Sequence, residues 1–173
     1  MYSQMIRMAL LFLALIMVAK GLSALEKFVR RRSQSEVVRQ LQSSSLLVFK
    51  VTRTVVFALA AVEATLSGSW TETGFVTGFV ALFFGMALRL SAIHALGPLW
   101  SYHVQAYRNH WRIEDGVYRY LRHPAYFGNI HIPGILLMVG APVSSIVALI
   151  GVGLFYFVRS RAEEELLSQL KAT

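Results

Sequence analysis

The sequence predicts an all-α integral membrane protein with about five transmembrane helices. Hydrophobic residues make up 55 % of the 173 positions, and the mean hydropathy is +0.53. This composition is too apolar for a soluble domain of this length. Long apolar regions also alternate with basic connections, as the charge asymmetry of membrane proteins requires. Lipid is therefore the expected solvent for most of the chain.

The first predicted span covers residues 6–25, close to the roughly 20 residues that cross a hydrocarbon core. Arg7 and Lys20 lie near its ends, where long side chains can reach the interface. A cleaved signal peptide is the alternative, because a cation precedes the apolar run, but the cleavage signal is poor. The second predicted span covers residues 46–66 and is entered through Lys50 and Arg53.

The third predicted span covers residues 75–96, and its small residues favour close helix packing. These are Gly74, Gly78 and Gly85. The last apolar region, residues 130–158, is interrupted at residues 140–142 by Gly, Ala and Pro. We therefore expect its two parts to form a hairpin of two short helices.

The positive charges predict the topology. The turns at residues 67–74 and 140–142 contain no Lys or Arg, whereas the other connections and the carboxyl-terminal tail are basic. Because cations concentrate in cytosolic loops, the amino terminus should lie outside and the carboxyl terminus in the cytosol. The basic residues are Lys27, Arg30, Arg31, Arg32, Arg39, Arg108, Arg112, Arg119, Arg122, Arg159, Arg161 and Lys171.

We expect a single membrane domain over residues 1–173. Residues 1–66 hold the first two helices and a basic loop, and residues 67–173 hold the third helix, a long polar loop and the hairpin. The expected location is a bacterial inner membrane, with the polar site facing the cytosol. The oligomeric state is left open.

Composition also excludes some functions. The net charge is +8, but the cations lie between apolar runs instead of forming one basic and aromatic surface. Nucleic acid is therefore not an expected partner. The chain has no cysteine, which rules out disulfides and thiolate chemistry. No histidine spacing suggests a metal site, because His123 and His131 have no convincing third ligand.

One candidate site is the segment from Gly116 to Gly128 in the long polar loop. Pro124 is well suited to the first position of a helix. The open N–H groups of that helix, beside Arg122 and His123, would suit a carboxylate or phosphate. The same residues also fit an ordinary proline-started helix with interfacial Arg and Tyr side chains, so this pattern alone leaves both interpretations open.

The second candidate site is the tail from Arg159 to Leu167. Arg159 and Glu163 are four residues apart, so a helix would bring them together on its surface. A solvated tail with salt bridges is one interpretation. The other is that the adjacent carboxylates of residues 163–165, on the cytosolic side, contact a cationic cofactor. Arg161 and Glu165 have the same spacing.

Taken in order, these motifs resemble the isoprenylcysteine carboxyl methyltransferase family. The resemblance covers roughly the carboxyl-terminal half, from Arg89 onward. The same core is also similar to phosphatidylethanolamine and thiol methyltransferases, and more distantly to membrane sterol reductases that use NADPH. The matching residues are the 95–101 segment Ala-Leu-Gly-Pro-Leu-Trp-Ser, His110, Gly116, Tyr118, Arg122, His123, Pro124, Tyr126, Gly128, Arg159, Glu163, Glu164 and Leu167.

The resemblance implies a methyltransferase that uses S-adenosylmethionine at the cytosolic face and takes a lipophilic acceptor from the bilayer. A carboxylate acceptor, giving a methyl ester, is expected first. The catalytic candidates are Arg159, Glu163 and His123: Arg159 would bind the acceptor or orient the carboxylates, and the other two could accept a proton from a phenol or amine. The implied cofactor residues are His123, Pro124, Tyr126, Gly128, Tyr118, Trp100, Glu163 and Glu164.

The sequence departs from the family pattern in three places. Val117 stands in the usual Gly-Pro-Tyr, Ser160 replaces an aliphatic residue, and six residues follow Leu167 where relatives commonly continue into an aromatic segment. The last of these departures affects the expected acceptor pocket more than the cofactor pocket. Two other functions stay open: an NADPH-dependent reductase of the sterol type, and a non-enzymatic membrane adaptor whose basic loops contact anionic lipid.

The remaining polar residues have weaker assignments. His103 and His110 are expected to be solvated loop residues. His131, at membrane depth, is expected to be a neutral imidazole that hydrogen-bonds between helices. Glu63 and Arg89 lie within predicted spans, where a charge is costly unless it is paired or faces water, so they should join helices or line an acceptor tunnel.

Overall fold

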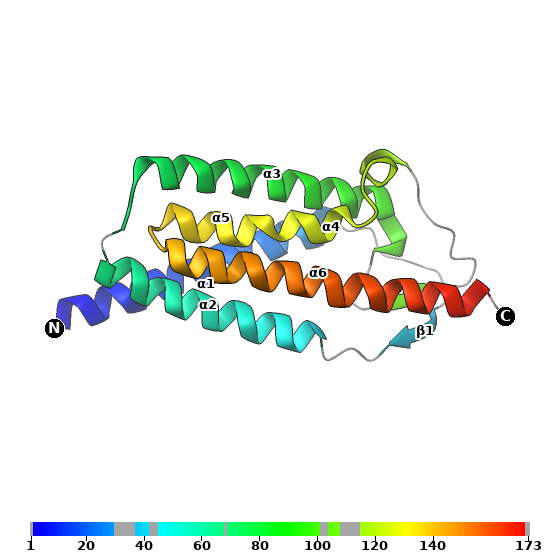
Figure 1. Cartoon of the computed structure of the whole chain (residues 1–173), viewed down its shortest axis with the longest axis horizontal. Coiled ribbons are helices and arrows are strands. Elements are labelled where there is room, and N and C mark those ends of the chain that lie inside the picture. Colours follow the sequence, from blue (N-terminus) through cyan, green and yellow to red (C-terminus); the bar gives the residue numbers. More distant parts are fainter. Residues whose placement is uncertain are drawn as a thin grey trace.

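The fold is a bundle of long helices that lie side by side, with their connections gathered at its two ends (Figure 1). The computed structural model describes residues 2–29, 37–41, 45–67, 69–100, 104–107 and 115–171. The longer helices are α1 (Tyr2–Val29), α2 (Ser45–Ser67), α3 (Glu72–Leu96), α5 (His131–Met138) and α6 (Pro142–Lys171). The shorter elements are β1 (Val37–Leu41), η1 (Gly97–Leu99), β2 (Val104–Tyr107), η2 (Gly116–Arg119), α4 (Pro124–Phe127) and η3 (Gly128–Ile130).

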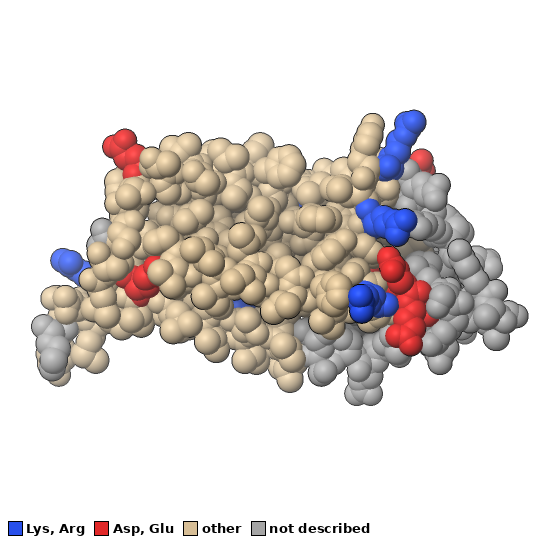
Figure 2. Space-filling view, viewed as in Figure 1, with Lys and Arg blue, Asp and Glu red and all other residues tan. Residues whose placement is uncertain are grey.

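Three of the described helices are long and apolar enough to cross a membrane: α1, α3 and the α6 segment up to Glu165. Their outward surfaces expose large apolar side chains, such as Phe83 on α3 and Leu154 on α6, as expected for contact with lipid. Figure 2 shows a broad central band that is almost free of charged side chains. The chain is therefore an integral membrane protein.

The other two predicted spans differ from these three. α2 has 23 residues but includes Lys50, Arg53 and Glu63, and α5 has only eight residues. Both pack among the longer helices, since α5 contacts α3 and α6, and α2 contacts α1 and α6. Five crossings and the orientation across the membrane thus stay predictions, while three apolar spans are present in the described structure.

The all-α fold class is confirmed, with one addition that the sequence did not predict. β1 and β2 form a small antiparallel sheet, in which Val37 pairs with Tyr107 and Leu41 with Val104. The two strands belong to the connection after α1 and the connection after α3. Short segments with Val and Tyr favour extended backbone once a partner strand is near, but a four-residue alternation is too short to predict that partner.

The predicted hairpin of two short helices was correct for its first arm and wrong for its second. α5 ends at Met138, and Gly140 adopts the left-handed φ of +78° that the turn requires. α6 then begins with Pro142 and runs for 30 residues without interruption. The i,i+4 charge pattern of the tail supports its continued helical structure.

The turn end of the bundle is held by Glu63 of α2. Its carboxylate accepts hydrogen bonds from the backbone N–H groups of Val143 and Ser144, each at 2.7 Å, and from the Ser144 hydroxyl at 2.7 Å. The first N–H groups of a helix have no partner within the helix, and its positive dipole end favours an anion. Glu63 therefore joins α2 to α6, which is one of the two roles expected for it.

Glycines set the close packing of α3 against the segment that contains η3 and α5. A Cβ atom at Gly78 would lie 2.5 Å from the carbonyl oxygen of Gly134, and one at Gly85 would lie 2.7 Å from the backbone nitrogen of His131. Such distances leave no room for a side chain. The packing role predicted for these two residues is confirmed.

We predict that Gly85→Ala lowers the unfolding free energy in detergent by roughly 1–3 kcal/mol, because the added methyl group must push α3 away from η3 and α5. Gly153→Ala is the matched control, since no atom lies within 4 Å of a Cβ at that helical position. Thermal unfolding of the two purified variants measures the difference. Equal stability of both variants would contradict the packing role of Gly85.

Candidate active site

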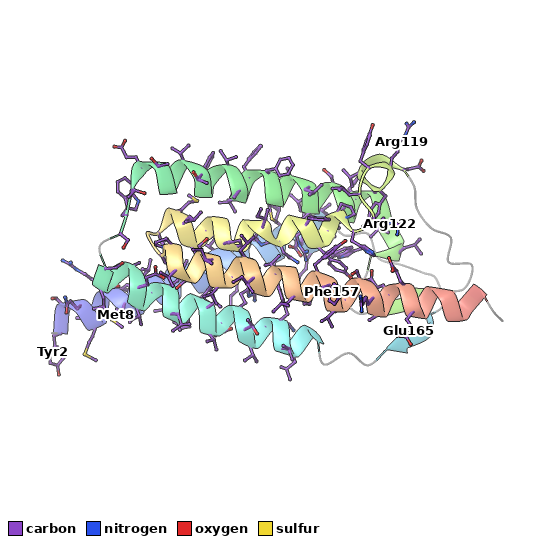
Figure 3. All side chains as sticks on the ribbon, viewed as in Figure 1. Tyr2, Met8, Arg119, Arg122, Phe157 and Glu165 are labelled. Carbon is purple, nitrogen blue, oxygen red and sulfur yellow. The ribbon has the colours of Figure 1, made fainter. Side chains whose placement is uncertain are left out.

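The polar side chains of the described structure gather at the end of the bundle opposite the two turns. Figure 3 shows Arg119, Arg122 and Glu165 at this end, far from Tyr2 at the other. The Gly116–Gly128 segment and the α6 tail therefore lie at the same end, as the sequence predicted. We call this end the polar end.

Local backbone geometry turns the segment back toward the bundle. Gly116 has a φ of +60°, a conformation that favours glycine, and it opens η2 directly after Asp115. His123 is not helical, and Pro124 then occupies the first turn of α4, as predicted. The backbone N–H of Tyr126 donates to the carbonyl of His123 at 3.1 Å. This tight turn places His123 and Tyr126 on adjacent positions facing α6.

His123, Tyr126, Glu163 and Glu164 form one group, which we call the acidic cluster. The two nitrogens of His123 face the two carboxylates: Nδ1 lies 3.5 Å from Glu163 Oε2, and Nε2 lies 3.7 Å from Glu164 Oε1. The Tyr126 hydroxyl donates to Glu163. The His123 and Tyr126 rings are stacked, with centroids 5.7 Å apart. The two motifs identified in the sequence thus meet in space, while the roles of their residues stay predictions.

The electrostatics keep both nearby phenols neutral. Burial raises the pKa of Tyr126, the Glu163 carboxylate raises it further, and Arg159 only partly opposes these effects. Burial likewise raises the pKa of Tyr118, again with a contribution from Glu163. Tyr126 can therefore act as a hydrogen-bond donor to Glu163 at neutral pH and is not a candidate base.

Arg159 lies on the other side of Tyr126. Its side chain is buried, with the residue 3 % exposed, and its Nε donates to the Tyr126 hydroxyl at 3.2 Å. The guanidinium also lies over the Phe155 ring, 5.6 Å from the centroid. The sequence predicted that Arg159 and Glu163 lie close together. Tyr126 bridges them, because its hydroxyl contacts both.

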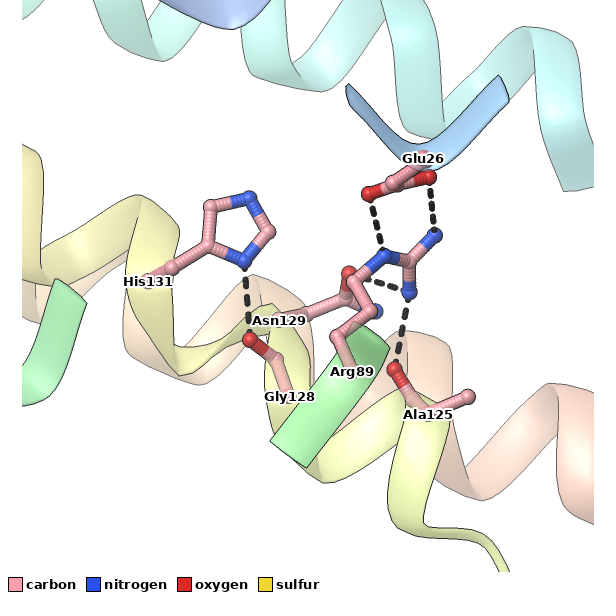
Figure 4. Close-up of polar contacts among 6 residues, drawn as sticks. All are labelled: Glu26, Arg89, Ala125, Gly128, Asn129 and His131. Carbon is pink, nitrogen blue, oxygen red and sulfur yellow. Dashed lines mark hydrogen bonds and ion pairs between the residues drawn. The ribbon is translucent and has the colours of Figure 1, made fainter. Parts of the chain in front are cut away.

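Arg89 of α3 lies at the centre of a second network (Figure 4). Its Nε and Nη2 donate to the two oxygens of Glu26, at 2.5 Å and 3.2 Å. Its Nη1 donates to the Ala125 carbonyl at 2.8 Å and to Asn129 Oδ1 at 3.1 Å. Arg89 therefore fixes the backbone of α4 between His123 and Asn129, and it joins α1, α3 and α4.

Sequence reasoning missed Glu26 and Asn129 in this network. The available signal was the arginine itself, since a guanidinium at membrane depth requires partners, and Glu26 is the only acidic residue of the first predicted span or its flank up to Lys27. Asn129 follows the motif glycine directly. Neither residue has a spacing pattern that separates it from an ordinary interfacial residue.

A cavity of about 600 Å³ lies inside the bundle, next to both networks. Three of the predicted site residues line it: Trp100, Tyr126 and Arg159. The rest of its wall comes from all the long helices, with apolar residues such as Phe57 and Ile135 beside the charged ones. The cavity therefore lies next to the acidic cluster, and Tyr126 belongs to both.

Three other predicted site residues are packed against neighbouring elements. A Cβ at Gly128 would lie 2.6 Å from Cβ of Arg89, so this glycine allows α3 to approach closely. Pro124 is buried, and Tyr118 packs against the core cluster that contains Ala125 and Trp100. None of these three residues lines the cavity. His103 and His110 lie outside the described residues.

His131 is hydrogen-bonded, but locally, to the residue three positions earlier, and not between helices as expected. Its Nδ1 lies 2.8 Å from the Gly128 carbonyl oxygen, so Nδ1 is the protonated nitrogen that donates (Figure 4). The residue is 8 % exposed and also lines the cavity. Nε2 is then left as the acceptor of a neutral ring.

The sequence profile of the isoprenylcysteine carboxyl methyltransferase family matches residues 76–169, which is more than half of the chain. The chain belongs to this family. Comparison with curated proteins gives no match. The matched range starts within α3, so the family segment contains Arg89, the acidic cluster and Arg159, while α1 and α2 precede it. In this family member Glu26, which holds Arg89, therefore comes from outside the matched segment.

We predict that Glu26→Gln destabilises the protein by about 3–5 kcal/mol, because it leaves the Arg89 charge buried without its counter-charge. Thermal unfolding in detergent measures the loss. Glu72→Gln, at an exposed position in the first turn of α3, is the control and should change stability by less than about 1 kcal/mol. The double variant Glu26→Gln with Arg89→Gln should recover part of the loss; full additivity of the two changes would argue against direct coupling.

Proposed function

We propose that the protein is an S-adenosylmethionine-dependent methyltransferase that methylates a lipophilic acceptor, with a carboxylate as the reacting group, at the cytosolic membrane face. Family membership supports a membrane methyltransferase. The observation that supports the arrangement is the position of Tyr126, whose hydroxyl contacts Glu163 on the side of the acidic cluster and Arg159 on the side of the cavity. Donor and acceptor would thus meet at Tyr126.

The chemistry of the acidic cluster fits the methyl donor. S-adenosylmethionine has a sulfonium and an ammonium cation, and carboxylates and aromatic faces both stabilise cations. Glu163 and Glu164 supply two carboxylates, and His123 and Tyr126 supply two stacked rings. The Glu164 side chain is 58 % exposed, which leaves it available to a ligand from the aqueous side. These four residues would hold the donor.

When bound, S-adenosylmethionine supplies an electrophilic methyl group on a positively charged sulfur. The residues of the chain then need only to position the acceptor and exclude water. Arg159, buried beside Tyr126, is placed to orient a carboxylate, since a guanidinium can bind one through two hydrogen bonds. A carboxylate is already ionised at neutral pH, so no general base is required. For a phenol or amine acceptor, His123 or Glu163 would take the proton.

The same cluster argues against the two other functions. A reductase would have to place the phosphates of NADPH near this end, and two adjacent carboxylates would repel them. An adaptor that only contacts anionic lipid has no need for two inward networks of charged and aromatic residues. Ligand binding therefore separates the three functions directly.

We predict that the protein in detergent binds S-adenosylhomocysteine, and that Glu164→Gln and His123→Ala each weaken this binding at least tenfold, or about 1.4 kcal/mol. Isothermal titration calorimetry measures the affinities. Glu165→Gln is the matched control in the same tail, because Glu165 is not one of the four residues assigned to the donor.

The outcome that would contradict the proposal is a folded protein that fails to bind S-adenosylhomocysteine. Thermal protection by NADPH instead would favour the reductase, since a specific ligand raises apparent stability. Normal binding by both the Glu164 and the His123 variants would place the donor elsewhere.

A further inference from the structure

The cavity has a charged end and an apolar end. Along α1 the lining runs from Ala19 to Lys27, and along α2 from Phe57 back through Arg53 and Lys50 to Leu47. In both helices the charged lining residues are nearer the helix end that lies at the polar end of the bundle, and α5, which supplies Ile135 to the lining, extends toward the turn end (Figure 1). An occupant of this cavity would therefore place a polar group near the acidic cluster and an apolar chain in the middle of the bundle.

The charges that line the cavity are unbalanced. Among the described residues of its wall, five are cationic and one is a carboxylate: Lys27, Lys50, Arg53, Arg89 and Arg159 against Glu26. Both oxygens of that carboxylate accept hydrogen bonds from Arg89. An excess of cations in a space between membrane helices is costly unless an anion or water enters it.

Arg53 of α2 is one of the cations in this wall. Its Nε is buried and has no hydrogen-bond partner among the described groups. A buried charged donor without a partner is expensive, and such a group calls for an explanation. The charges of Glu26 and Arg89 act on it, but these two residues already bind each other. An oxyanion in the cavity would satisfy this donor.

Neighbouring residues of α2 complete the site. Arg53 is four residues from both Phe49 and Phe57 and three from Lys50, so its helix face is shared with each of them. All four residues line the cavity. The Phe49 ring lies 4.4 Å from the Phe155 ring, centroid to centroid, and Phe155 contacts Tyr126 edge-on. A continuous aromatic wall thus leads from Arg53 to the hydroxyl that contacts Arg159.

We propose that Arg53 and Lys50 of α2 form an oxyanion-binding subsite of the cavity, so that the acceptor is an anionic amphiphile whose acidic group binds there. This inference rests on the proposed function and names the acceptor class. The acidic group is a carboxylate or a phosphate on an apolar chain, and Arg53 is a specificity-determining residue because it binds that group. The subsite lies outside the segment that matches the family.

The test compares three single-chain amphiphiles: palmitate, hexadecyl phosphate and hexadecanol. Their binding to the full chain in detergent is measured by calorimetry, without any methyl donor. At least one of the two anions should bind tenfold or more tightly than the neutral alcohol. Preference for palmitate would identify the group as the acceptor carboxylate, and preference for hexadecyl phosphate would identify it as a lipid-type phosphate.

Arg53→Gln should remove this preference and leave hexadecanol binding unchanged. Lys50→Gln, at an exposed position on the same face, should weaken anion binding severalfold, and Arg53→Lys should retain part of it. Lys20→Gln, on α1 and outside the cavity wall, is the matched control. If Arg53→Gln does not fold, the Lys50→Gln and Arg53→Lys variants decide the matter.

Equal binding of anions and alcohol by the wild type, or unchanged anion preference in all the α2 variants, would overturn the subsite. Binding of S-adenosylhomocysteine is measured on the same samples. Its loss in the wild type would refute the proposed function, whereas normal binding together with no anion preference would refute only the subsite.

Discussion

The ion pair between Arg89 and Glu26 is the interaction on which the polar end depends. Both side chains are largely buried, at 11 % and 7 % exposed, where each charge alone would be costly, so the ion pair holds α1 and α3 together. Arg89 uses its remaining donors on the Ala125 carbonyl and Asn129. The guanidinium therefore fixes α4 relative to α1 and α3. As a result, His123 and Tyr126 face α6.

The position of α4 in turn decides where the cavity and the acidic cluster meet. With α4 fixed, the Tyr126 ring forms the boundary between the acidic cluster and the cavity, and its hydroxyl contacts Glu163 and Arg159 on either side. Because the phenol stays protonated, it can donate to the carboxylate and still accept from the guanidinium. The opposite end is held independently, by Glu63 on the first turn of α6, so the two ends are stabilised by separate polar contacts.

The sequence predicted those features that depend on local pattern. Apolar length located the helices, the absence of cations located the turns, and Pro124 located the start of α4. The meeting of His123 with Glu163 followed from topology and the family resemblance. The β1–β2 pairing, the partner of Arg89 and the cavity wall from α2 could not be predicted, because each depends on which distant residues face one another. Glu26 and Arg53 have ordinary sequence surroundings, and only packing makes them part of a site.

The charge pattern of the cavity has a further consequence if the acceptor is a carboxylate. The substrate would enter as an anion and be stabilised by Arg53 and Arg159, but methylation converts it to a neutral ester. The ester loses the charge-assisted contacts and keeps only its apolar chain, which the bilayer accommodates as well as the cavity does. A cationic cavity would therefore bind substrate more tightly than product, which favours product release.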